Sequence, residues 1–115
     1  MIKAEKIKAH MEKIQKSSHH IIKTIEYITP DTIIITPNDS KALESLLAKV
    51  YEDIPKYQED SKYKLNPAYL KPNKEGKYII QIIPENKCYP EAINSTNHFT
   101  LHFSHAVHNY VHRPH

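Results

Sequence analysis

The chain has 115 residues, of which 39% are hydrophobic and 25% are charged, and its formal net charge is +3. A chain of this length is expected to form one domain that can fold without disulfides. The only cysteine, Cys88, excludes an internal disulfide framework, and the only glycine, Gly76, excludes glycine-rich loops that bind nucleotide phosphates.

The charge pattern bears on the partner and the compartment. Basic and acidic side chains are balanced along the chain, and Arg113 is the only arginine. Binding to nucleic acid needs a basic stripe that neutralises many phosphates, so nucleic acid is not favoured as a partner. No apolar run approaches the length of a membrane span, and the N-terminus lacks the apolar segment of a signal peptide. The sequence therefore predicts a cytoplasmic protein that does not bind membranes.

Residues 2–28 show the strongest periodicity. Apolar and small residues recur there at alternating spacings of three and four, namely Ala4, Ile7, Met11, Ile14, Ser18, Ile21, Ile25 and Ile28. This spacing predicts one long amphipathic helix that ends before Pro30. Either the helix docks on a partner or a second copy, or it packs on the protein's own sheet. Under the first interpretation the partner-binding residues are Ile7, Met11, Ile14 and Ile21.

The next elements are predicted from β-branched runs and a helix-start signal. Residues 32–36, TIIIT, predict a buried strand, and residues 77–83, KYIIQII, predict a central strand because both of its faces are apolar. Between them, Thr36 and Pro37 resemble a helix start, and apolar residues line one side of a helix that continues to about Asp53.

Residues 55–76 are predicted to be an irregular loop. Three prolines interrupt the segment, and tyrosines recur every six residues, at Tyr57, Tyr63 and Tyr69. Long segments of this kind are usually functional or mobile. The tyrosines either pack on the domain or serve as aromatic anchors for a partner.

Residues 98–104, HFTLHFS, alternate strictly between apolar and polar side chains. This alternation predicts a strand with His98, Thr100 and His102 on its polar face. The four residues from His98 to Leu101 resemble one copy of the H-x-[T/S]-x motif of the two-histidine phosphoesterases. That resemblance implies imidazoles acting as acid and base and a hydroxyl holding phosphate. No second copy of the motif lies on a separate strand.

Six of the nine histidines fall within residues 98–115. Imidazole is a ligand for zinc and copper, so His98, His102, His105 and His108 are the candidate metal ligands. No Asp or Glu follows Glu91 to orient such ligands locally, and neither H-E-x-x-H nor C-x-x-C occurs. Besides acid–base catalysis and metal binding, the third interpretation of these histidines is that they form a solvated face and tail with no specific chemistry.

Together these patterns predict a small α+β domain over residues 1–115, with two helices on one face of a three-stranded sheet. No complete catalytic set is present. We therefore expect a binding or regulatory protein, of the inhibitor or adaptor kind, that docks on another protein or on a second copy as a homodimer. No cofactor is expected, and zinc at the histidines is the alternative. The other alternative is a phosphoesterase or ribonuclease-like enzyme that uses His98, Thr100 and His102.

Overall fold

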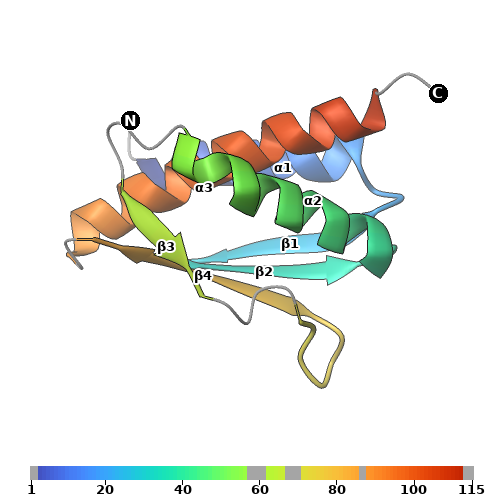
Figure 1. Cartoon of the computed structure of the whole chain (residues 1–115), viewed down its shortest axis with the longest axis horizontal. Coiled ribbons are helices and arrows are strands. Elements are labelled where there is room, and N and C mark those ends of the chain that lie inside the picture. The colour runs from blue at the N-terminus through green and yellow to red at the C-terminus, as the bar shows by residue number, and fades with distance from the viewer. Residues whose placement is uncertain (1–2, 57–61, 67–70, 86–87, 113–115) are drawn as a thin grey trace.

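The structure, a computed structural model, describes residues 3–56, 62–66, 71–85 and 88–112 (Figure 1). In chain order its elements are α1 (Lys3–Ser17), β1 (Ile22–Ile28), β2 (Thr32–Pro37), α2 (Ser40–Asp53), the 3-10 helix η1 (Ile54–Lys56), β3 (Tyr63–Leu65), β4 (Tyr78–Pro84) and α3 (Tyr89–Val111). The predicted α+β class is confirmed. The described ranges contain three α-helices and four strands, one more of each than the sequence predicted.

The four strands form one antiparallel sheet in the order β1-β2-β4-β3. Pairing of β2 with β4 joins the β1–β2 pair to the β3–β4 pair. Figure 1 shows α1, α2 and α3 on the same side of this sheet. α3 packs against α1, α2 and β4, so it lies in the middle of the helical layer. The fold therefore has two layers, and no described helix covers the second side of the sheet.

The predicted helix over residues 2–28 is wrong beyond Ser17. The chain turns at Ser18, whose carbonyl accepts hydrogen bonds from the amides of Ile21 and Ile22, and it then returns as β1. Residues 21–28 are rich in β-branched side chains, which prefer strands. The three-four spacing continues past the true end of the helix by coincidence. Ile28, which the helical pattern placed on the apolar side, is 49% exposed.

The strand predicted at 32–36 is confirmed as β2, and the helix predicted after it is confirmed as α2. The helix begins one turn later than expected, because Thr36 and Pro37 complete β2. Asp39 is the N-cap, and its Oδ1 accepts a hydrogen bond from the amide of Ala42 at 3.1 Å. Leucines and a valine on one side of α2 are buried: Leu43, Leu46, Leu47 and Val50.

The predicted strand over residues 98–104 is wrong, as is the loop predicted before it, because both belong to α3. Pro90 lies in the first turn of the helix, where its missing N–H is not needed. Phe99, Phe103 and Val107 recur every four residues and are fully buried. Leu101 fitted the period-two alternation, but it is 37% exposed because a helix turns it away from the two phenylalanines.

The core lies between the helical layer and the inner face of the sheet. Alternate residues of β4 point inward, and Tyr78, Ile80 and Ile82 are fully buried. Ile33 and Ile35 of β2 are buried beside them. The strand predicted at 77–83 is thus confirmed as β4, an interior strand. Its other apolar residues, Ile79 and Ile83, point to the side without helices.

Candidate functional site

The structure buries the residues that the helical pattern offered for partner binding. Ile7, Met11 and Ile14 of α1 belong to the hydrophobic core, and Ile21 precedes β1 in the same core. Their exposed fractions are between 0% and 5%. Of the two interpretations of these residues, the structure therefore agrees with packing inside the protein's own core. These four side chains are therefore not accessible to a partner in the folded chain.

The three tyrosines of residues 55–76 do not form a described exposed set. Tyr63 is in β3 and is 5% exposed, so it is a core residue. Tyr57 and Tyr69 lie outside the described residues, and their predicted role stays a prediction.

The histidines of α3 lie along a helix rather than on a strand face. His98 and His102 are four residues apart on one side of the helix, with ring centroids separated by 4.4 Å. The rings of His102 and His105 are 6.3 Å apart. Because the helix replaces the predicted strand, Thr100 does not share the face of His98 and His102. The predicted set of His98, Thr100 and His102 is therefore not assembled.

Thr100 lies instead at the contact between α3 and α1. Its hydroxyl donates a hydrogen bond to the carbonyl of Asn97 at 3.0 Å. His10 Nδ1 lies 3.3 Å from the same Thr100 oxygen. Since that hydroxyl proton is already engaged, His10 donates its Nδ1–H to the Thr100 oxygen. Thr100 is fully buried and serves the helix–helix contact.

Tyr63 of β3 orients the first of the α3 histidines. A hydrogen bond of 2.7 Å joins Tyr63 Oη and His98 Nδ1. Burial raises the pKa of the Tyr63 phenol, so Tyr63 stays protonated. Burial, followed by repulsion from His98 and His105, lowers the pKa of His102. His102 is therefore a neutral imidazole at neutral pH.

A hollow of 310 Å³ lies beside His102, between α2 and α3. It is lined by Val50, Asp53, His102, His105, Ala106 and Asn109. Asp53 forms ion pairs of 3.6 Å with Lys49 and Lys56. The lining offers a proton acceptor and a carboxylate, but it includes no hydroxyl or thiol that could act as a nucleophile. The phosphoesterase alternative therefore gains no support from this hollow.

The histidines also bear on metal binding. In the described ranges, no three His, Cys, Asp or Glu side chains are grouped so that they could hold a metal ion. His108 is exposed near the end of α3, where its ring packs against His112 at 4.4 Å between centroids. The four predicted ligands thus lie in three places. His98 contacts Tyr63, His102 and His105 line the hollow, and His108 is near the exposed end of α3.

The side of the sheet without helices is a surface that the sequence did not point out. It carries isoleucines from three strands: Ile28 of β1, Ile34 of β2, and Ile79 and Ile83 of β4. Ile28, Ile79 and Ile83 are 49%, 41% and 38% exposed, and Ile34 is half-buried. We call this surface, with the threonines and glutamine between the isoleucines, the open sheet face.

The register of the sheet arranges the open sheet face in rows. Directly paired residues of antiparallel strands point to the same side. Glu26 pairs with Ile34, and Ile34 pairs with Ile79, so one row runs from an acidic edge to an apolar centre. On the other outer strand, Lys64 pairs with Ile83. The central strands β2 and β4 contain no charged residue.

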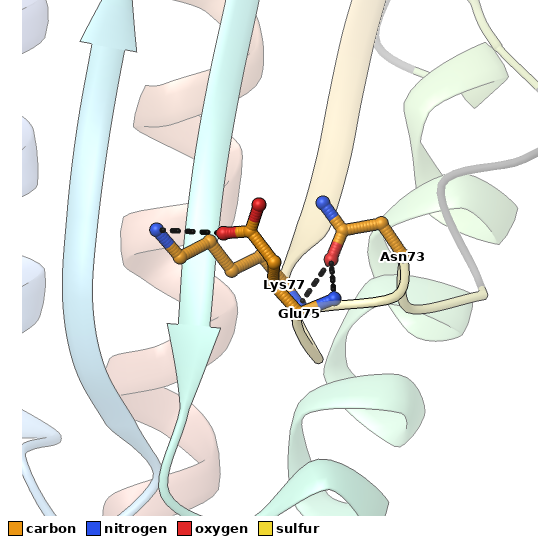
Figure 2. Close-up of polar contacts among 3 residues, drawn as sticks. All are labelled: Asn73, Glu75 and Lys77. Atoms are coloured by element: carbon orange, nitrogen blue, oxygen red, sulfur yellow. Dashed lines mark hydrogen bonds and ion pairs between the residues drawn. The ribbon is translucent and has the colours of Figure 1, made fainter.

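A hollow with two lysines in its lining adjoins Ile79 near the start of β4. It has a volume of 340 Å³ and is lined by Asn66, Lys71, Pro72, Asn73, Lys77 and Ile79. Figure 2 shows how Asn73 shapes its wall: its side-chain oxygen accepts hydrogen bonds from the amides of Glu75 and Lys77, both at 2.9 Å. Lys77 also forms an ion pair of 3.7 Å with Glu75. The positive φ of Gly76, 79°, allows the turn to close.

The signal for this surface was present in residues 77–83. A strand with apolar residues on both faces predicts a central strand, and β4 does lie inside the sheet. The structure covers only one side, so the second set of isoleucines is exposed. Sequence alone could not show this difference, because it depends on where the helices lie.

No protein-family model matches the chain, and neither the curated proteins nor the solved structures include a significant match. Over the part of the chain that the structure describes, no helix has the length and apolar character needed to cross a membrane.

Proposed function

We propose that this chain is a protein-binding protein of the regulatory or adaptor kind, which docks through its open sheet face and has no catalysis of its own. The observation that carries the proposal is the exposure of Ile28, Ile79 and Ile83 on the side of the sheet that no described helix covers. Exposed apolar side chains that gather on one side of a sheet are typical of interaction sites.

The composition of the open sheet face favours a protein over a nucleic acid. Sheet surfaces that bind single-stranded nucleic acid present aromatic side chains for base stacking, together with a basic groove for the backbone. Among the described residues of β1, β2 and β4, the tyrosines Tyr27 and Tyr78 belong to the inner face with Ile33 and Ile35. The open sheet face offers isoleucine and threonine instead.

The chemistry of the partner surface follows from the same residues. Its centre must be apolar and uncharged, because β2 and β4 present isoleucine, threonine and glutamine there. A buried charge without a partner would oppose binding at this centre. At the rim the partner can carry an acidic group near Lys71 and Lys77, and a basic group near Glu26.

Site-specific photo-crosslinking tests the proposal. A photoreactive amino acid replaces Ile79 in one variant and Leu101 of α3 in the control; the native residues are 41% and 37% exposed. We expect a discrete protein adduct from position 79 only. The partner, once identified and purified, should bind at least about tenfold more weakly to Ile79→Asp, with Leu101→Asp unchanged. A lack of protein adducts from position 79, or equal adducts from both positions, would overturn the proposal.

A further inference from the structure

We infer that His108 and His112, at the C-terminal end of α3, form an exposed two-imidazole chelate for a divalent transition metal ion of the copper and nickel class. The two residues are four positions apart in the chain at the end of one helix, so their side chains lie on the same side in successive turns. This site is separate from the open sheet face, and the inference does not depend on the proposed function.

The separation of the two rings fits a shared metal ion. The ring centroids of His108 and His112 are 4.4 Å apart, and the ring planes are inclined by 46°. A metal ion lies about 2.1 Å from each ligating imidazole nitrogen, and therefore about 3.2 Å from each ring centroid. Two imidazoles at a right angle around one ion then have centroids about 4.5 Å apart. The observed separation therefore needs little change to accommodate an ion.

The backbone holds the two imidazoles at this spacing before a metal ion binds. His112 is the C-cap of α3, and its amide donates a hydrogen bond of 3.0 Å to the carbonyl of His108. Tyr110 and Val111, in the same turn, pack against the hydrophobic core. Binding therefore costs little additional ordering of the backbone. The negative end of the helix dipole also lies at this turn, and it favours a cation.

The chemistry of the donors selects the class of ion. Imidazole is a good ligand for copper, nickel and zinc, whereas calcium and magnesium prefer oxygen ligands. Both side chains are exposed, so water can fill the remaining positions around the ion. Two nitrogens with water oxygens suit the tetragonal geometry of copper(II) and nickel(II). Among the described residues no three metal-ligating side chains come together, so the closed four-ligand site that structural zinc requires is not formed.

Two other histidine pairs are less suited to this binding. His98 and His102 have the same spacing and the same ring separation, but both are half-buried, and a hydrogen bond joins His98 Nδ1 to Tyr63. An ion at that pair would lose more of its hydration shell. His19 and His20 are exposed, but they are adjacent in the turn after α1, with ring centroids 6.1 Å apart. The second pair therefore provides an exposed control.

Isothermal titration calorimetry of the untagged, metal-free chain with nickel(II) chloride tests the site. We expect a single nickel ion per chain, and an affinity at least about tenfold lower in His108→Gln/His112→Gln. Each single variant should bind as weakly as the double variant, because one imidazole cannot chelate. The matched control, His19→Gln/His20→Gln, removes the same number of imidazoles and should keep the wild-type affinity. Magnesium chloride should give no binding. Circular dichroism establishes that each variant is folded.

Nuclear magnetic resonance spectroscopy locates the ion, because nickel(II) with water in its coordination shell is paramagnetic and broadens nearby signals. At low nickel concentration, the amides of the last turn of α3 should broaden before those of His98 and His102, which lie at least about 9 Å away along the helix. Broadening that begins at His98 and His102 would overturn the inference. So would equal affinity in the wild type and in His108→Gln/His112→Gln, which would indicate an adventitious ion only. Single variants that each keep about half of the wild-type binding would indicate two independent imidazoles, and would overturn the chelate.

Discussion

Replacing Ile14 with alanine tests whether α1 belongs to the core or presents a docking surface. The substitution removes three carbon atoms from a side chain that is 1% exposed and belongs to the central hydrophobic cluster. Losses of this kind cost about 2–5 kcal/mol, against a total stability of about 5–15 kcal/mol for a small domain. With an unfolding entropy of about 2.1 cal/mol/K per residue over 115 residues, the melting temperature should fall by roughly 8–20 °C.

Urea unfolding followed by circular dichroism measures the effect, with Glu12→Ala on the exposed side of α1 as the control. The control should change stability by no more than about 0.5 kcal/mol. If Ile14→Ala lost less than about 1 kcal/mol and instead weakened self-association, Ile14 would lie at an interface, and the packing of α1 described above would be refuted.

Two further predictions concern pH and the start of α2. Burial, followed by repulsion from neighbouring basic side chains, lowers the pKa of His10 and of His102, so the unfolded chain binds more protons than the folded one below about pH 6.5. The stabilising contribution of the two neutral histidines is therefore fully present above this value. The urea midpoint should decrease as the pH is lowered from about 7.5 to about 5.5. The urea midpoint of the double variant His10→Gln/His102→Gln should decrease less over this pH range. A decrease equal to that of the wild type would contradict the assignment of the pH dependence to these two histidines. Asp39→Ala removes the N-cap contact and should cost about 1 kcal/mol in urea unfolding, whereas Asp39→Ser should retain most of the stability.

The local elements with clear end signals were predictable. β2 and β4 are dense in isoleucine and lie between turn residues, and α2 has a buried leucine side and an acidic N-cap. In each case the local preference of the chain agrees with its tertiary environment. Such agreement between levels is what makes an element readable from sequence.

The two ends of the chain were mispredicted for the same reason. Residues 18–28 satisfy a helical spacing, and residues 98–104 satisfy a strand spacing, but each pattern is also compatible with the other structure over a short window. Pairing with β2 selects the strand for residues 22–28, and packing of Phe99 and Phe103 against the core selects the helix for α3. These contacts are distant in sequence, so no local pattern contains them.

Sequence by itself determined the α+β class and three of the main elements, because these depend on local propensity and on apolar periodicity. Tertiary structure alone decided which apolar residues are covered. It buried Ile7, Ile14 and Tyr63, which looked available for a partner, and it left Ile79 and Ile83 exposed. The physical reason is that the hydrophobic effect is non-directional, so an apolar side chain is stabilised by burial against any apolar neighbour. Its position in the sequence indicates that burial is favourable, but not which element buries it.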